Sequence, residues 1–168
     1  MIAAAEPQSY LRVSLPRQQL EWIERGQVLR SYPVSTAKNG PGERRGSGCT
    51  PRGWHCIRAK IGAALPDNTV FVGRRPTGEI YTPELAAAHP ERDWILTRIL
   101  WLGGLEPGFN RYGAVDTAWR YIYIHGSPEH GVPGTPQSHG CVRMRSRDLL
   151  DLFDRVPNGM AVLLTESA

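Results

Sequence analysis

The residues best suited to covalent chemistry lie in one short run, Ser138-His139-Gly140-Cys141, with a further histidine upstream at His125. A thiol is a strong nucleophile only as its thiolate, so a reactive cysteine needs a nearby imidazole, a helix N-terminus or converging backbone N–H groups. Both histidines are candidates for that imidazole. Gly140 permits a tight turn that can aim amide groups at a developing oxyanion. The pattern predicts acyl transfer through Cys141 as the nucleophile.

A loop must bring the two halves of this constellation together. Residues 121–124 are typical of a short strand that ends at His125, and the 12 residues 126–137 separate this histidine from the run around Cys141. The stretch is rich in Gly and Pro, and it is long enough to arch over a cleft and return. We therefore expect His125 beside Cys141, with Ser146 as the N-cap of a helix directly after the nucleophile.

The other cysteines and histidines have a simpler structural interpretation. A single cysteine is most often a small buried side chain. The residues assigned to this class are Cys49, Cys56, His55 and His89. Three cysteines cannot close a disulfide framework, so at least one thiol is free, which suits a reducing compartment.

Zinc binding is the competing chemical interpretation. A mixed nitrogen and sulfur site could draw on His125, His130, His139 and Cys141. Their spacing matches no common zinc pattern, and His139 and Cys141 would have to chelate across a single glycine. We therefore expect neither a metal nor another cofactor.

Composition and charge limit the class of protein. The 168 residues fit one domain, 1–168, and the 18 Gly and 14 Pro favour turns and short strands over long helices. The net charge is +4, but the basic residues form no dense stripe, so we expect no nucleic-acid partner. Residues 1–7 lack the features of a signal peptide, and no stretch is apolar enough to span a membrane. We expect no membrane association and a cytoplasmic protein, or a periplasmic one if its N-terminus was trimmed.

Alternation of apolar and polar residues predicts a mainly β fold. The opening segments, 10–15, 20–24 and 28–36, are expected to form an antiparallel meander. Further strands are expected over 54–59, 70–72, 94–102, 121–124 and 160–164. Residues 38–53 and 73–93 are expected to be loops, the second with a short helix at 83–88. The reliable helix after Ser146 has one apolar side and is stopped by Pro157-Asn158-Gly159.

Two longer motifs indicate a family. The segments Ile124-His125-Gly126-Ser127 and Ser138-His139-Gly140-Cys141-Val142-Arg143-Met144 closely resemble the signature of the L,D-transpeptidase catalytic domain, the YkuD-like family. Residues 10–36 look like the opening strands of that family, and Thr50-Pro51-Arg52-Gly53 is similar to its Thr-Pro-x-Gly segment. The resemblance covers nearly the whole chain. It implies a β-sandwich with one principal α-helix after the catalytic cysteine.

The resemblance also implies a specific reaction. In this family the cysteine attacks the carbonyl of the third residue, usually diaminopimelate, of a peptidoglycan stem tetrapeptide, so that D-Ala leaves and a thioester forms. An amine acceptor then gives a crosslink or an attached protein (L,D-transpeptidase). Water gives a trimmed tripeptide (L,D-carboxypeptidase, muropeptide recycling). Stem peptides or muropeptides are the expected partners, and carbapenem-type inhibitors are expected to acylate Cys141.

Carried over by position, the resemblance assigns the catalytic groups. Cys141 is the expected nucleophile and His125 the expected general base, oriented by the backbone carbonyl of Gly126. The oxyanion pocket and substrate contacts are expected from His139, Gly140 and Cys141.

Two side chains are assigned to substrate binding. Ser138 is expected at the substrate, where it also supports the turn, and Arg143 is a candidate partner for a substrate carboxylate. The alternative for Arg143 is a structural role on loop carbonyls. A catalytically silent peptidoglycan-binding module is a different class of function, but such a module should have lost Cys141 or His125, and this chain retains both. The acceptor of the acyl group stays open.

Overall fold

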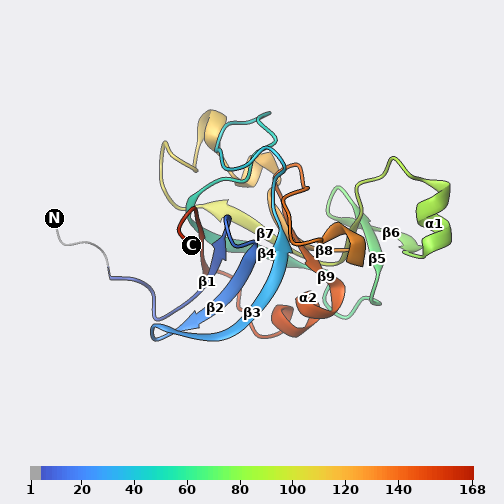
Figure 1. Ribbon diagram of the computed structural model, residues 1–168, viewed down its shortest axis with the longest axis horizontal. Helices are drawn as coiled ribbons and strands as arrows, with labels where there is room; N and C mark the ends of the chain where they lie inside the picture. The colour runs from blue at the N-terminus through green and yellow to red at the C-terminus, as the bar shows by residue number, and fades with distance from the viewer. Residues whose placement is uncertain (1–4) are drawn as a thin grey trace.

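A strongly curved β-sheet with two short helices makes up the computed structural model, which describes residues 5–168 (Figure 1). Residues 1–4, part of the segment predicted to lack a signal peptide, lie outside the described residues. The strands are β1 (Ser9–Ser14), β2 (Gln19–Glu24), β3 (Gln27–Ser35), β4 (Gly53–Ile61), β5 (Thr69–Val72), β6 (Arg75–Ile80), β7 (Ile95–Gly104), β8 (Tyr123–Ser127), β9 (Val142–Arg145) and β10 (Ala161–Thr165). The helices are α1 (Pro83–Ala88) and α2 (Ser146–Phe153).

Eight of the strands close on themselves. The hydrogen-bonded order is β4-β10-β1-β2-β3-β9-β8-β7, and a further pairing of β4 with β7 completes the ring. Opposite halves of the ring therefore face each other across one core, as in a sandwich. The pairs β1–β10 and β8–β9 are parallel, and the other pairs are antiparallel. The predicted mainly β fold and the opening meander are confirmed.

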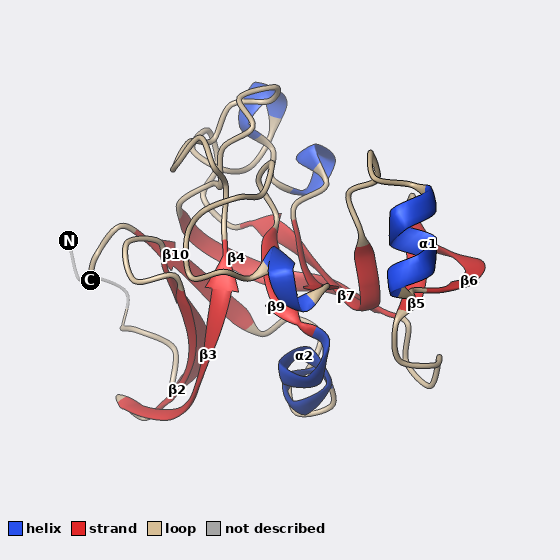
Figure 2. Ribbon diagram, turned by 45° about the vertical axis from the view of Figure 1, so that its right-hand side comes forward, coloured by secondary structure: helices blue, strands red, loops and turns tan. Residues whose placement is uncertain are grey.

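The main core fills the ring. Alternating residues of β1, such as Leu11 and Val13, are fully buried there. The apolar side of α2 contributes Leu149, Leu152 and Phe153 to the same core, so this helix covers the sheet below β9 in Figures 1 and 2. The predicted apolar face of the helix is confirmed.

Two local predictions are wrong, and one strand, β9, was not predicted. Residues 73–93 contain strand β6 as well as the predicted helix, because β6 is a mostly exposed edge strand without apolar alternation. Residues 142–145 form β9, which is too short for its alternation to be recognised in the sequence. The N-cap of α2 is Arg145, and the Ser146 hydroxyl instead lies 2.6 Å from Oγ1 of Thr97.

The long connections gather at one end of the ring. Residues 36–52, 105–122 and 128–141 lie together above the sheet in Figure 1, while β5, β6 and α1 lie to one side in both ribbon views. Backbone hydrogen bonds join the first and third connections, from Lys38 N–H to the Ser138 carbonyl and from Ser138 N–H to the Thr36 carbonyl. The predicted reactive run therefore lies where three connections meet.

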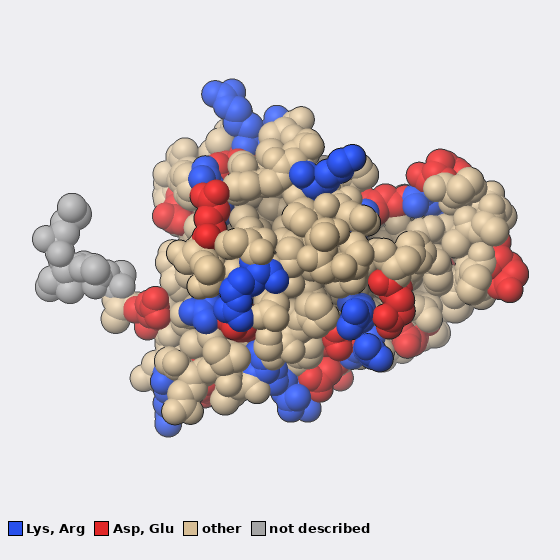
Figure 3. Space-filling view, viewed as in Figure 1, with Lys and Arg blue, Asp and Glu red and all other residues tan. Residues whose placement is uncertain are grey.

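The face of the molecule drawn in Figure 3 shows no single dominant charge. Basic and acidic side chains are interspersed on the face drawn in Figure 3. Across residues 5–168, no helix is long and apolar enough to cross a membrane.

Candidate active site

Parallel pairing of β8 with β9 places Cys141 and His125 on one face of the sheet. His125 lies opposite Arg143 in the register, and Cys141, just before β9, receives a 3.3 Å hydrogen bond from the backbone N–H of Tyr123 to its Sγ. Since side chains alternate along a strand, Tyr123 and His125 share a face, as do Cys141 and Arg143. Val142 points to the opposite face and joins the main core. The register therefore places the two residues on adjacent strands and on one face, as their expected proximity requires.

The thiol of Cys141 lies between backbone groups. Besides accepting from Tyr123, its S–H donates to the carbonyl of Tyr121 at 3.5 Å. Burial among protein atoms raises the pKa of Cys141 to about 11, although the Tyr123 N–H and the guanidinium of Arg143 act in the opposite direction. The prediction that the local structure lowers this pKa is wrong for the resting site. Strand β9 separates the sulfur from α2, so the helix N-terminus does not reach it.

His125 has a defined tautomer and no charge at neutral pH. Its ring is 1% exposed, and Nδ1–H donates to the carbonyl of Gly126 at 2.7 Å, the contact expected from the resemblance. Burial lowers the pKa of His125, against the opposing effect of that hydrogen bond. With the proton held on Nδ1, Nε2 keeps its lone pair and can accept a proton. The resting site is thus a neutral thiol beside a neutral imidazole.

The turn before Cys141 is braced from both sides. Ser138, 2% exposed, donates its hydroxyl to the Cys141 carbonyl at 2.6 Å and accepts the N–H of Gly140 at 3.2 Å. Thr50 donates to the carbonyl of Gly140 at 2.9 Å and accepts the N–H of Ala37 at 2.9 Å. The Ser138 hydroxyl therefore supports the turn and is not open to a substrate. Because the Gly140 amide is already bonded, the Cys141 and His139 amides are the better candidates for oxyanion donors.

Two glycines in the motifs are required by close packing. Gly140 has φ +135°, and a Cβ there would lie 3.0 Å from Ile122 and 3.1 Å from the carbonyl oxygen of Cys49. At Gly126 a Cβ would clash with the Leu96 carbonyl oxygen. Each glycine lets the reactive segment lie directly against a neighbouring backbone.

Asp93, which was not identified from the sequence, has a carboxylate that contacts two residues of the motif, Arg143 and His139. Arg143, whose side chain is 13% exposed, donates from Nη2 to Asp93 Oδ1 at 2.9 Å, and Nδ1 of His139 lies 3.6 Å from Asp93 Oδ2. Neither interpretation offered for Arg143 matches this resting contact, since its partner is a carboxylate of the protein and not a loop carbonyl. The imidazole of His139 is 83% exposed, so it faces solvent and does not activate the thiol.

A large pocket opens beside the thiol. We call it the His139 pocket; its volume is about 690 Å³. It is lined by Arg45, Gly46, Gly48, Trp119, Arg120, Tyr121, Ile122 and His139. Cys141 does not line the pocket, but the carbonyl that accepts its S–H belongs to the lining residue Tyr121, so one wall of the pocket adjoins the thiol.

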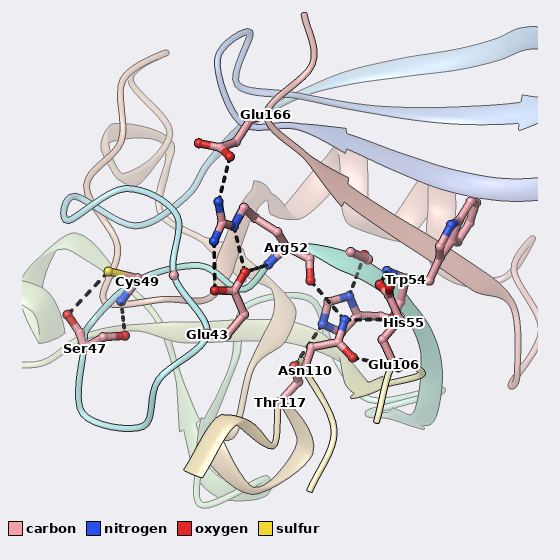
Figure 4. A network of polar contacts seen from close by, with 12 residues as sticks. Glu43, Ser47, Cys49, Arg52, Trp54, His55, Glu106, Asn110, Thr117 and Glu166 are labelled. Carbon is pink, nitrogen blue, oxygen red and sulfur yellow. Dashed lines mark hydrogen bonds and ion pairs between the residues drawn. The ribbon is translucent and has the colours of Figure 1, made fainter. Parts of the chain in front are cut away.

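Polar contacts of partly buried arginines hold the wall of this pocket. Arg120 donates to the carbonyls of Gly42, Glu43 and Cys49. Figure 4 shows Arg52 between Glu43 and Glu166, at 2.7 and 2.9 Å. The Thr-Pro-x-Gly segment thus anchors the loop that closes the site.

The side chains assigned to structural roles make no hydrogen bond with the Cys141 thiol or the His125 ring in the described residues. His55 is fully buried, and its ring bonds the Gly53 carbonyl and the Thr117 hydroxyl, each at 2.9 Å (Figure 4). Cys49 and Cys56 are free thiols. Within residues 5–168, no three His, Cys, Asp or Glu side chains are grouped so as to hold a metal ion, so the four candidate zinc ligands are not brought together.

The missed residues have weak sequence signals. Asp93 is one carboxylate in a predicted loop, and no local pattern links it to Arg143, 50 residues later. Thr50 lies in a recognised motif, but its bond to Gly140 spans 90 residues. Only the folded chain brings these partners together.

Alkylation of Cys141 by iodoacetamide is expected to be slow at neutral pH and to accelerate about tenfold per pH unit up to about pH 10. A pKa of about 11 leaves roughly one molecule in 10⁴ as thiolate at pH 7. Peptide mapping by mass spectrometry would give the rate for Cys141 separately from Cys49 and Cys56. A rate that is already maximal at pH 7 would contradict the neutral resting thiol.

Asp93→Asn supplies a matched test of the same electrostatics. The Asp93 carboxylate raises the pKa of Cys141, so its neutralisation should lower that pKa and speed alkylation at pH 8. Glu91→Gln, a nearby carboxylate on an exposed side chain, is the control and should leave the rate unchanged.

Thr50→Val is expected to destabilise the fold by about 1–3 kcal/mol, because the buried Gly140 carbonyl and Ala37 N–H lose their partner. Denaturant unfolding measures the change. Thr77→Val, at an exposed position, is the control, with an expected effect within about 0.5 kcal/mol. Equal stability of Thr50→Val and wild type would show that the bond does not brace the turn.

Comparison with known proteins agrees with this geometry. The family model for the L,D-transpeptidase catalytic domain (YkuD) matches residues 8–164. No curated protein matches the chain. Similar solved structures include an L,D-transpeptidase from Xylanimonas cellulosilytica (TM-score 0.56, 21% identity, covering 97% of this chain and 63% of that one). Another is an L,D-transpeptidase from Mycobacterium smegmatis (TM-score 0.59, 18% identity, 94% and 58%).

A third similar structure is L,D-transpeptidase 3 from Mycobacterium tuberculosis in complex with a faropenem-derived adduct (TM-score 0.56, 16% identity, 95% and 61%). At these identities the structures establish the shared fold, and the chain spans less than two thirds of the length of each. The family model, in contrast, covers nearly the whole sequence. The chain belongs to the L,D-transpeptidase catalytic domain family.

Proposed function

We propose that this chain is a cysteine-dependent acyltransferase that cleaves the bond between residue 3, diaminopimelate, and the terminal D-Ala of a peptidoglycan stem tetrapeptide. The observation that carries the proposal is the register of β8 and β9, which places Cys141 and His125 on one face with the proton of the imidazole on Nδ1. Membership of the family supports the substrate class.

The first half-reaction uses both residues. The substrate carbonyl lies against Sγ of Cys141, whose proton passes to Nε2 of His125 as the C–S bond forms. The tetrahedral oxyanion is held by the backbone amides of the turn, and its collapse breaks the C–N bond. D-Ala leaves with the proton from His125, and the acyl group stays on Cys141 as a thioester.

The second half-reaction takes an amine or water. His125 removes a proton from the acceptor, which attacks the thioester and restores the thiol. An amine gives a crosslinked product, and water gives the tripeptide. The cytoplasmic or periplasmic setting remains a prediction from sequence. Acylation of Cys141 by carbapenem-type inhibitors belongs to the same proposal, supported by the structure of the L,D-transpeptidase LdtMt1 in complex with the carbapenem imipenem.

Product analysis by mass spectrometry tests the proposal and identifies the acceptor. Purified protein with a disaccharide tetrapeptide should release D-Ala. Tripeptide without dimer identifies a carboxypeptidase, and 3→3 dimers identify a transpeptidase. The proposed function would be contradicted if the protein released no D-Ala from tetrapeptides whose diaminopimelate is amidated and none from tetrapeptides whose diaminopimelate is not amidated.

A further inference from the structure

The connection between β7 and β8, residues 105–122, displays an unusual share of the exposed apolar side chains. In the described part of the chain, nine large hydrophobic residues are exposed, and this connection holds five of them. They are Leu105, Phe109, Tyr112, Trp119 and Tyr121. Clustered exposed aromatic rings beside an enzyme site mark a surface for binding, and we call this segment the aromatic connection.

An arginine guanidinium lies over each exposed aromatic ring of this connection. The pairs are Arg52 with Phe109, Arg58 with Trp119, Arg74 with Tyr121 and Arg111 with Tyr112, with guanidinium-to-centroid distances of 4.7 to 5.9 Å. Arg52 is neutralised by Glu43 and Glu166. Within residues 5–168, Arg58, Arg74 and Arg111 have no carboxylate at ion-pair distance. The guanidinium of Arg74 donates to the Tyr123 hydroxyl at 3.0 Å. The guanidinium groups of Arg58 and Arg111 are stacked on rings and free at their edges, an arrangement that suits carboxylates.

A second pocket extends this surface away from the thiol. The Arg58 pocket, of about 240 Å³, is lined by Arg58, Arg111, Tyr112 and Trp119, among others. Trp119 also lines the His139 pocket, so the indole is the shared wall between the two. A ligand that occupies both pockets therefore runs from the neighbourhood of Cys141 across Trp119 to the guanidinium groups.

The backbone of the connection holds its rings outward. Tyr112 and Tyr121 have φ of 73° and 57°, values that a residue with a Cβ adopts at a cost. Neither ring is buried in return, since their exposed fractions are 57% and 47%. Asp116 stabilises this arrangement because its carboxylate accepts the backbone N–H groups of Tyr112 and Trp119, at 2.7 and 3.1 Å. The conformation maintains the exposed rings.

We propose that the aromatic connection and the Arg58 pocket bind the peptidoglycan polymer, taking the carboxylates of a stem peptide next to the one at Cys141 and stacking sugar rings on Trp119 and Tyr112. This inference rests on the proposed function, since it extends the same substrate. The charges are complementary, because neighbouring stems of one strand present repeated carboxylates to the unpaired arginines. The preferred substrate is accordingly a strand with several stems.

Cosedimentation with purified, insoluble peptidoglycan tests this surface. Cys141→Ala protein, which cannot turn over the polymer, is the parent, and the Arg58→Gln/Arg111→Gln change is added to it. The added change should lower the bound fraction at least fivefold at equal ionic strength. Arg25→Gln/Arg147→Gln, which removes the same charge from exposed positions elsewhere, should leave it within twofold of the parent. Equal melting temperatures would establish that all variants are folded.

The results separate this inference from the proposed function. Three outcomes would overturn the polymer-binding surface. The parent protein does not sediment with peptidoglycan, the Arg58→Gln/Arg111→Gln variant sediments like its parent, or the Arg25→Gln/Arg147→Gln control loses as much binding as the Arg58→Gln/Arg111→Gln variant. Release of D-Ala from a soluble disaccharide tetrapeptide by the wild-type chain tests the chemistry alone. That assay can succeed while the binding assay fails, and the reverse also holds.

Discussion

Replacement of Cys141 by alanine is expected to lower D-Ala release from a stem tetrapeptide by at least about 10⁴-fold. The thiol is the only group in the proposal that forms a covalent bond to the substrate. Removing Sγ also removes two weak backbone contacts, so the melting temperature should change little. Initial rates measured with a coupled D-Ala assay would give the loss.

Cys49→Ala is the matched control for this prediction. Cys49 is another free thiol, and its backbone carbonyl lies against the turn at Gly140, but its sulfur contacts only loop carbonyls. We expect this variant to keep at least a third of wild-type turnover. Activity retained in Cys141→Ala would exclude the proposed nucleophile.

His125→Gln is expected to reduce kcat by about 10²–10⁴-fold. Glutamine can keep a hydrogen bond to the Gly126 carbonyl, but it cannot accept the thiol proton at the position of Nε2. Because the resting thiol is neutral, turnover by this variant should come to depend on solvent-formed thiolate. Its rate should therefore rise steadily with pH towards the thiol pKa of about 11.

His89→Gln controls for the loss of a histidine. His89 is partly exposed at the end of α1 and lies 3.7 Å from Glu91. Its replacement should leave both the rate and the pH profile unchanged. A His125→Gln variant with the wild-type pH profile would show that another group accepts the proton.

Local patterns predicted most of the fold because burial and strand periodicity coincide there. Leu11 and Val13 of β1 alternate as a strand with a core face must, and α2 buries Leu149 and Leu152 as a helix does. Strand β6 was not predicted because its side chains are mostly exposed and show no apolar alternation. The closure of β4 against β7 has no local signal, since it depends on pairings distant in sequence.

The sequence assigned the reactive residues of the site, an assignment that stays a prediction, but it did not indicate their environment. Motifs identified Cys141 and His125, whereas the pairing of Asp93 with Arg143 depends on three-dimensional proximity. The raised pKa of Cys141 shows the same limitation. Neighbouring residue types suggested activation, but burial dominates the electrostatics of the resting thiol.

The central claim is that the acyl group is carried by Cys141. Its most direct test is acid quenching of the enzyme during turnover of a disaccharide tetrapeptide, followed by intact-mass measurement and peptide mapping. The expected species is a protein heavier by the substrate less D-Ala, with the label on the peptide that contains Cys141. Two results would contradict an acyl group on Cys141. One is D-Ala release at full rate with no labelled protein at any quench time. The other is a label on Cys49, Cys56 or another side chain.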